Sequence, residues 1–234
     1  EDTGAQILFS KLSDDDNTQR EYRAWYQNST IKFQIYRNGS SYSAYWSNSS
    51  TPMSSNGWYH ITITYNGDED APAAYLYINA SSVSWTRGPE NHSGFTNTTA
   101  DLVIGGKHDG GSTYDTMVHS QMADVVLWNK ELTSSDVTEL YSSGKVMDIT
   151  QHSQFSRVVS WWKMGDGLDT VSGTDAIKDS VGSNHGTPFG TIQIVTPTGL
   201  GTTQEFTYDR KVNASTAVSG VIDFRRPTGS ATNH

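Results

Sequence analysis

The sequence contains no cysteine, and this absence excludes disulfide bonds, thiol chemistry and cysteine-based zinc sites. Basic residues are also few, with 16 Lys and Arg against 25 Asp and Glu, and the clearest basic cluster is the pair Arg225 and Arg226. A nucleic-acid-binding surface needs an extended basic face, so we expect no nucleic acid partner. No apolar run approaches the length of a membrane-spanning helix, so we expect no membrane insertion either.

What the sequence does contain is a series of short segments rich in β-branched and aromatic residues, separated by Ser, Gly and Asn. In the clearest of them, Ile31, Phe33 and Ile35 alternate with more polar neighbours, as in a half-buried strand. A strand and a turn about every ten residues is typical of a β-sandwich or barrel. The predicted strands are 7–11, 21–26, 31–37, 42–46, 59–65, 74–79, 102–105, 122–128, 158–164 and 191–196.

One helix is predicted directly after one of these strands. Thr133 has the position of an N-cap, and the carboxylate of Asp136 faces the free N–H groups of the helix start. Leu132 and Val137 have the spacing of a hydrophobic staple, and Gly144 suits a left-handed residue at the helix end. A helix of about ten residues is marginal alone in water, so its apolar face must pack against the rest of the protein.

Four phrases follow one another along the first part of the chain: GWYHITITYNG (Gly57–Gly67), AAYLYINAS (Ala73–Ser81), LVIGG (Leu102–Gly106) and ADVVLWNKELTSSDVTELY (Ala123–Tyr141). In this order they resemble the laminin-G-like, concanavalin-A-like lectin and glucanase sandwich family, over about residues 1–145. The resemblance implies an all-β fold, a jelly-roll sandwich of two antiparallel sheets with one short helix packed at the edge of the core.

A second pair of phrases, VVSWWKMGDG and IKDSVGSNHGT, lies within residues 158–187. It resembles an element of virion surface proteins of marine phages and of secreted bacterial proteins. We interpret its polar residues as structural, because Asp179 and Asn184 are suited to satisfy the backbone of a turn. Gly182 and Gly186 are then expected to supply positive φ angles.

We expect three parts: the sandwich at 1–149, strands at 150–196 that pack on it or open a second unit, and an extended, β-rich polar arm at 197–234. The family usually opens with an earlier strand or two, whereas only six residues precede Ile7. Either an upstream part is missing or another segment fills that place in the sheet. We therefore expect Val158–Met164 or the arm, from the same chain or a neighbouring copy, to pair with the sheet edge beside the first strands.

The same sandwich fold includes glucanases, which use a pair of carboxylates from one strand as acid and nucleophile. No predicted strand carries alternating Glu and Asp residues, and the dense carboxylate groups lie in loops. We therefore expect a protein that is not an enzyme.

The acidic loops suggest a metal site instead. Alternate loops of an antiparallel sandwich lie at the same end, which brings together 12–20, 66–73 and 106–121 and places the long polar segment 80–101 at the opposite end. Clustered carboxylate oxygens suit Ca²⁺, although acidic loops can also serve solubility alone. The candidate calcium ligands are Asp14, Asp16, Asp68, Asp70, Asp109 and Asp115.

A glycan-binding surface is expected from aromatic residues on consecutive strands, because aromatic faces stack on the C–H surfaces of sugars. Neighbours in a strand point to opposite faces, so either Tyr45 or Trp46 must point outward. The alternative for each aromatic residue is that it fills the core. The candidate glycan-binding residues are Trp25, Tyr36, Tyr42 and Trp46.

These features predict a non-enzymatic recognition or adhesion module that binds a cell-surface glycan or polysaccharide outside a cell, and that is carried on a virion surface in one version of this hypothesis. The alternative is a structural virion protein, such as a decoration, fibre or tail component, that uses the sandwich as a building block. In that case the arm contacts other copies or other virion proteins.

Overall fold

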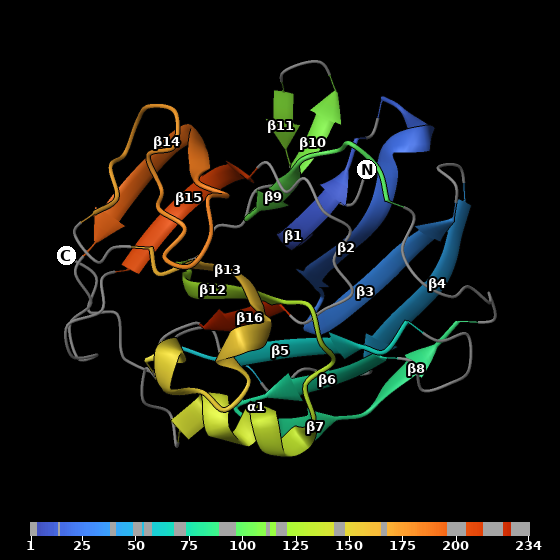
Figure 1. The fold of residues 1–234 in the computed structure, drawn as a ribbon. Coiled ribbons are helices and arrows are strands. Elements are labelled where there is room, and N and C mark those ends of the chain that lie inside the picture. The colour runs from blue at the N-terminus through green and yellow to red at the C-terminus, as the bar shows by residue number, and fades with distance from the viewer. Residues whose placement is uncertain are drawn as a thin grey trace.

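The computed structural model shows two antiparallel β-sheets, one short α-helix and a small β-hairpin (Figure 1). Among the residues that it describes, no helix is both long and apolar enough to cross a membrane. The described residues are 4–13, 15–37, 41–48, 53, 58–67, 74–88, 97–110, 113–115, 121–142, 148–164, 168–195, 205–212 and 222–225.

Eight strands form the first sheet, and neighbouring strands in it run antiparallel. Their order is β14 (Gly186–Val195), β15 (Glu205–Val212), β9 (Leu102–Ile104), β1 (Gln6–Leu12), β2 (Arg20–Gln27), β3 (Thr30–Arg37), β4 (Ser41–Asn48) and β8 (Trp85–Arg87). Six strands form the second sheet. Their order is β13 (Val158–Trp162), β12 (Ala123–Trp128), β16 (Ile222–Arg225), β5 (His60–Tyr65), β6 (Ala74–Ile78) and β7 (Ser81–Val83).

The main core lies between the two sheets and is filled by alternate residues of the strands. The ring of Phe33 in β3 lies 5.6 Å from that of Trp46 in β4 and 6.4 Å from that of Tyr65 in β5, measured between centroids. One side chain of the first sheet thus packs against both its own sheet and the opposite one. Fully burying such a side chain stabilises the fold by about 1.5–3 kcal/mol. The predicted all-β sandwich is confirmed.

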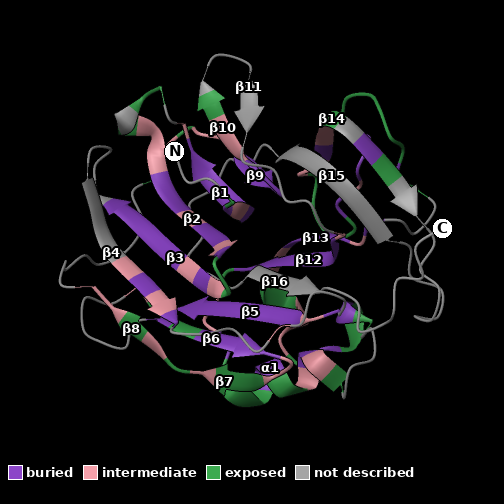
Figure 2. Ribbon diagram, turned by 180° about the vertical axis from the view of Figure 1, so that it is seen from behind, coloured by how far each residue is buried: buried purple, intermediate pink, exposed green. Residues whose placement is uncertain are grey.

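The other face of the second sheet is covered as well, by the helix α1 (Ser134–Tyr141) and the segment that follows it. Val137 and Leu140 of α1 are fully buried against Trp128 and Trp161 of that sheet. This double cover explains why β5, in the middle of the sheet, is buried along its whole length (Figure 2). The helix packs on the sheet as predicted.

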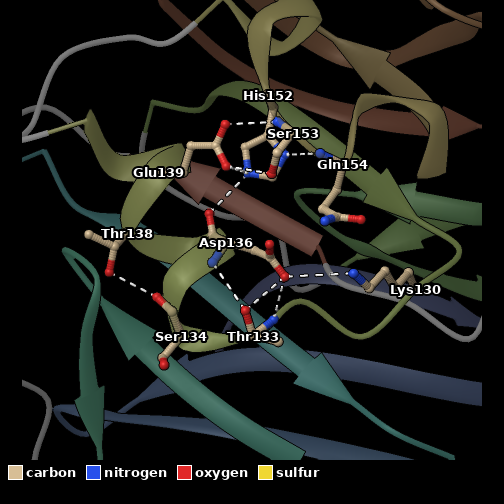
Figure 3. Close-up of polar contacts among 9 residues, drawn as sticks. All are labelled: Lys130, Thr133, Ser134, Asp136, Thr138, Glu139, His152, Ser153 and Gln154. Atoms are coloured by element: carbon tan, nitrogen blue, oxygen red, sulfur yellow. Dashed lines mark hydrogen bonds and ion pairs between the residues drawn. The ribbon is translucent and has the colours of Figure 1, made fainter.

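The start of α1 has the predicted capping residues (Figure 3). The backbone N–H of Asp136 donates to the hydroxyl of Thr133, and the carboxylate of Asp136 accepts from the backbone N–H of Thr133 at 2.8 Å. The helix ends earlier than expected, because Ser142 takes the left-handed conformation with φ 43° and its N–H donates to Thr138. The prediction for Gly144 concerns a residue outside the described ones.

A second set of polar contacts ties α1 to the segment after it (Figure 3). His152 is buried; its Nδ1 accepts from the backbone N–H of Gln154, so its Nε2 carries the proton and donates to the carbonyl of Asp136 at 3.0 Å. The carboxylate of Glu139 accepts from the backbone N–H and the hydroxyl of Ser153. These contacts tie the helix to the segment after it, and the ring of His152 also packs on Trp128 of β12, with the ring centroids 4.9 Å apart.

The segment 80–101 is not one uninterrupted loop. It contains the short strands β7 and β8, which pair with β6 of the second sheet and β4 of the first. The chain therefore crosses from one sheet to the other between Val83 and Trp85. The hairpin β10 (Lys107–Gly110) and β11 (Thr113–Asp115) lies further along the chain, in what was expected to be another loop.

The arm at 197–234 contributes one strand to each sheet of its own chain. β15 lies between β14 and β9, and β9 lies between β15 and β1, so the arm extends this sheet at β9 and does not pair with the first strands themselves. β16 lies between β12 and β5 inside the second sheet, which was not expected. Val158–Met164 pairs through β13 with β12, not with the first strands. Contacts of the arm with other copies or virion proteins stay a prediction.

The turn after β13 depends on one buried carboxylate. The Oδ1 atom of Asp179 accepts from the backbone N–H groups of Trp161, Val181 and Gly182, each at 3.0 Å. Its Oδ2 atom accepts from the backbone N–H of Asn184 at 3.2 Å. The structural interpretation of Asp179 is thus confirmed, because its side chain folds the turn and attaches it to β13.

The expectation for the two glycines of this turn is wrong. Gly186 lies in the extended strand β14, and neither it nor Gly182 has a positive φ. Gly182 is required for space instead, since a Cβ atom there would lie 2.7 Å from Oδ2 of Asp179 and 3.0 Å from the carbonyl oxygen of Val159.

Removing the charge of the capping carboxylate is expected to destabilise the protein in a pH-dependent way. Burial raises the pKa of Asp136, but hydrogen bonds from Thr133 and the nearby charge of Lys130 outweigh burial and lower it below 3.8. The stabilisation is therefore complete above this value and is lost as the pH falls through the lower pKa of the folded state. Asp136→Asn should lower the free energy of unfolding by about 1 kcal/mol at neutral pH.

Urea unfolding at neutral and at acidic pH measures this effect, and the difference between the wild type and Asp136→Asn should shrink in acid. Ser135→Ala, at an exposed position of the same helix, is the control and should change little at either pH. An unchanged difference in acid would contradict the assigned role of the carboxylate.

The close approach at Gly182 predicts a second effect on stability. Gly182→Ala should lower the free energy of unfolding by about 1–3 kcal/mol, because the added methyl group forces the turn away from β13. Ser180→Ala changes an exposed residue of the same turn and should leave the melting temperature unaltered. Equal thermal melts of both variants would show that the turn relaxes without cost.

Candidate functional site

The outer face of β2, β3 and β4 carries a patch of aromatic, amide and basic side chains. Successive residues of a strand point to opposite faces, and Phe33 and Trp46 point into the core, so their strand neighbours point away from it. Cross-strand pairing places Trp25 directly opposite Lys32. We call this surface the outer patch, and it consists of Arg23, Trp25, Gln27, Lys32, Gln34, Tyr36 and Tyr45.

Two cations of the outer patch lie against the same aromatic ring. The guanidinium carbon of Arg23 is 4.4 Å from the centroid of Trp25, and the ammonium nitrogen of Lys32 is 5.7 Å from it. Arg23 also lies 6.0 Å from the ring centroid of Tyr36. The negative face of an aromatic ring attracts such cations by about 0.5–1 kcal/mol at exposed sites.

Two glutamine side chains hold these cations in place. The Oε1 atom of Gln34 accepts from Nε of Arg23 at 3.0 Å and from the hydroxyl of Tyr36 at 3.2 Å. The Oε1 atom of Gln27 accepts from the ammonium group of Lys32 at 2.9 Å. The cations of the patch are thus fixed by neutral amide oxygens.

Trp25 is one of the two most enclosed residues of the outer patch, together with Gln34. It is 4% exposed and forms a small apolar cluster with Ala5 and Ile7, against which Tyr45 packs with its ring 6.0 Å away. Its indole Nε1 is buried and makes no hydrogen bond with the described residues. A buried donor without an acceptor costs about 1–3 kcal/mol. The indole N–H of Trp25 is thus a buried donor without an acceptor among the described residues.

The four predicted glycan-binding aromatics have different positions. Trp25 and Tyr36 belong to the outer patch, although both of them are buried. Trp46 is 1% exposed in the main core, so its face is not available to a ligand, and Tyr45 is the residue that points outward. Tyr42 lies in β4, and its side chain is outside the described part of the structure.

The cations of the patch were missed because the sequence was searched for clusters of adjacent basic residues. Arg23 and Lys32 are far apart in the chain and meet only through the pairing of β2 with β3. The sequence did contain a usable signal. Arg23 precedes Trp25 by two residues, so both point to the same face of their strand. Lys32 is next to Phe33 in its own strand, so these two residues point to opposite faces of the sheet.

The predicted calcium ligands do not converge among the described residues. Asp16 caps a short 3-10 helix, where hydrogen bonds from the hydroxyl and backbone N–H of Thr18 lower the pKa of its carboxyl. Asp109 lies 3.7 Å from the ammonium group of Lys107, and Asp115 is in β11 with its side chain outside the described part. The remaining candidates, Asp14, Asp68 and Asp70, are outside the described residues.

The positions of the loops agree with the expected alternation only in part. The hydroxyl of Ser13 lies 3.2 Å from Nδ1 of His108, so the loops 12–20 and 106–121 share one end as predicted. The placement of 80–101 at the opposite end is wrong for its last residues. The backbone N–H of Thr99 donates to the side chain of Gln19, because β7 and β8 add two strands that the alternation did not count.

The end of this segment is also anchored from inside. Lys11 and Glu21 form a buried ion pair; the ammonium group of Lys11 donates to the carbonyl of Thr98, and the hydroxyl of Thr98 donates to the carboxylate of Glu21. In the described ranges, no three His, Asp or Glu side chains lie close enough together to hold a metal ion. Calcium at this rim stays a prediction.

The fold of the first part of the chain has a counterpart among known families. No curated protein sequence matches the chain. The family model described as the concanavalin A-like lectin/glucanases superfamily matches residues 1–138, which contain β1 to β12 and most of α1. Because the match covers more than half of the chain, the protein belongs to the concanavalin A-like lectin/glucanases superfamily.

Proposed function

We propose that this protein is a non-catalytic recognition module that binds carbohydrate on the outer patch. The observation that carries the proposal is the Trp25–Tyr45 pair, in which an indole N–H without an acceptor lies beside amide and cationic donors. Sugars combine apolar C–H faces with many hydroxyl groups. The patch offers aromatic rings for the first and hydrogen-bond donors for the second, and family membership supports a lectin-type role.

The position of the patch suits recognition. Its residues project from three adjacent strands of one sheet, whose opposite side is packed into the main core. A rigid support of this kind reduces the entropy that a binding site loses when a ligand is bound. The aromatic side chains have few rotatable bonds, so they also lose little freedom on binding.

Access to Trp25 requires movement of the two cations that lie over it. Arg and Lys side chains are long, and exposed ones change rotamer within nanoseconds. We propose that Arg23 and Lys32 swing away from the indole ring and donate to ligand oxygens, while the sugar ring takes their place. Tyr45 is partly exposed already and forms the edge of the site.

The patch itself offers no carboxylate for hydrolysis. Glycoside hydrolysis needs a pair of carboxyl groups about 5–10 Å apart, whereas the seven residues of the outer patch carry none. We therefore propose binding without turnover, at a place where glycans are displayed, such as a cell or particle exterior.

Substitution of the aromatic pair tests the proposal. A glycan array should first identify a bound sugar, and Tyr45→Ala should then weaken its binding about tenfold in titration calorimetry, because the stacking surface is lost. Trp25→Phe keeps a ring but removes the N–H donor, so it should weaken binding with little effect on the melting temperature.

Tyr75→Ala is the matched control, since Tyr75 is an exposed tyrosine on β6 of the other sheet. It should leave affinity unaltered. An array without any bound glycan, or an equal loss in Tyr75→Ala and Tyr45→Ala, would refute the outer patch as a carbohydrate site.

A further inference from the structure

The outer patch is a basic island in an acidic protein. The whole chain has a net charge of −9, but the stretch 20–37 contains four basic residues, Arg20, Arg23, Lys32 and Arg37, and one acidic residue, Glu21. Glu21 is fully buried in its ion pair with Lys11, so it does not neutralise this surface. Of the four basic residues, Arg23 and Lys32 place their positive charges beside Trp25 in the outer patch.

Among the described residues, Arg23 and Lys32 have no carboxylate partner, because their contacts are amide oxygens and aromatic rings. Lys11, Lys107 and Lys130, by contrast, each lie within ion-pair distance of a carboxylate. The side chains of Arg23 and Lys32 are only partly exposed. Water therefore screens their charges less than it screens those of fully exposed side chains.

The two charges also lie beside one aromatic ring, 4.4 Å and 5.7 Å from the Trp25 ring centroid, so both act on the space next to this ring. Partly buried like charges in the same neighbourhood repel each other. An anion bound between them removes this repulsion. It also gains charge-assisted hydrogen bonds, which are roughly twice as strong as neutral ones.

We propose that the ligand of the outer patch is an anionic polysaccharide, with carboxylate or sulfate groups bound by Arg23 and Lys32 and with a sugar ring packed on Trp25 and Tyr45. This inference rests on the proposed carbohydrate-binding function and adds the chemical class of the sugar. A nucleic acid fits the patch less well, because binding along a phosphate backbone needs an extended basic face, whereas this patch places two cations beside a single ring.

The experiment compares polymers that differ only in charge. Polygalacturonate is paired with its methyl ester, and dextran sulfate with dextran, and each is titrated with the full chain at low and high salt. The wild type should bind the anionic member of at least one pair about tenfold more tightly than the neutral member. Added salt should reduce this preference, because it screens the charges.

Arg23→Gln and Lys32→Gln should each reduce the preference for the anionic polymer about tenfold. Arg23→Lys keeps the charge and should keep most of the preference, which separates electrostatics from a loss of packing on Trp25. Arg157→Gln removes an exposed basic residue outside the outer patch and is the matched control. Thermal melts of all variants show whether the fold is retained.

The possible outcomes separate this inference from the proposed function. If the neutral and anionic polymers bind equally and Tyr45→Ala weakens both, the carbohydrate site stands and the anionic specificity is overturned. If no polymer binds and the glycan array is also empty, the proposed function itself fails. Equally tight binding of single-stranded DNA that Tyr45→Ala leaves unchanged would reveal charge attraction alone, and it would overturn the inference as well.

Discussion

Packing around Phe33 is the constraint on which both faces of the first sheet depend. Its ring contacts Phe9, Trp46 and Trp85 of the same sheet and Tyr65 of the opposite one. A shift of β3 by one residue would turn this ring to the solvent and Lys32 into the core. The same burial that holds the sheets together therefore decides which side chains form the outer patch.

The rest of the chain stabilises this arrangement by closing the ends and edges of the sheets. The buried pair of Lys11 and Glu21 joins β1 to β2 and fixes Thr98, just before β9. A buried ion pair adds little net stability compared with apolar packing, but removal of one partner is costly, so such pairs favour a single geometry. Asp179 has a comparable role beside β13, where one carboxylate organises a whole turn.

Features encoded by neighbouring residues could be predicted from the sequence. The alternation of Ile31, Phe33 and Ile35 and the cap at Thr133 and Asp136 depend only on local geometry, and both are confirmed. The sequence could not predict which residues of β4 point into the core, because Tyr45 and Trp46 are both aromatic and the serines around them give no apolar alternation. Burial of Trp46 against Phe33 decides it.

Features that depend on how separate strands pair with each other could not be predicted from sequence patterns. The approach of Arg23 and Lys32 to one indole ring requires the register of β2 against β3. The short strands β7 and β8 lie in a polar segment that has no alternation of apolar and polar residues, so they were not predicted. Because these two strands were not counted, the residues just before β9 were assigned to the wrong end of the sandwich. The family match covers residues 1–138 and so carries no information about β15 and β16.

The central place of β16 also determines the order in which the second sheet can be completed. β5 and β12 are both synthesised well before β16, yet the pairing that joins them runs through Ile222 and Asp223. Contacts between segments so distant in the chain form slowly, because the intervening loop must first be closed. While the polypeptide leaves the ribosome, the growing sandwich holds two unpaired strand edges, and the last strand closes the sheet between them.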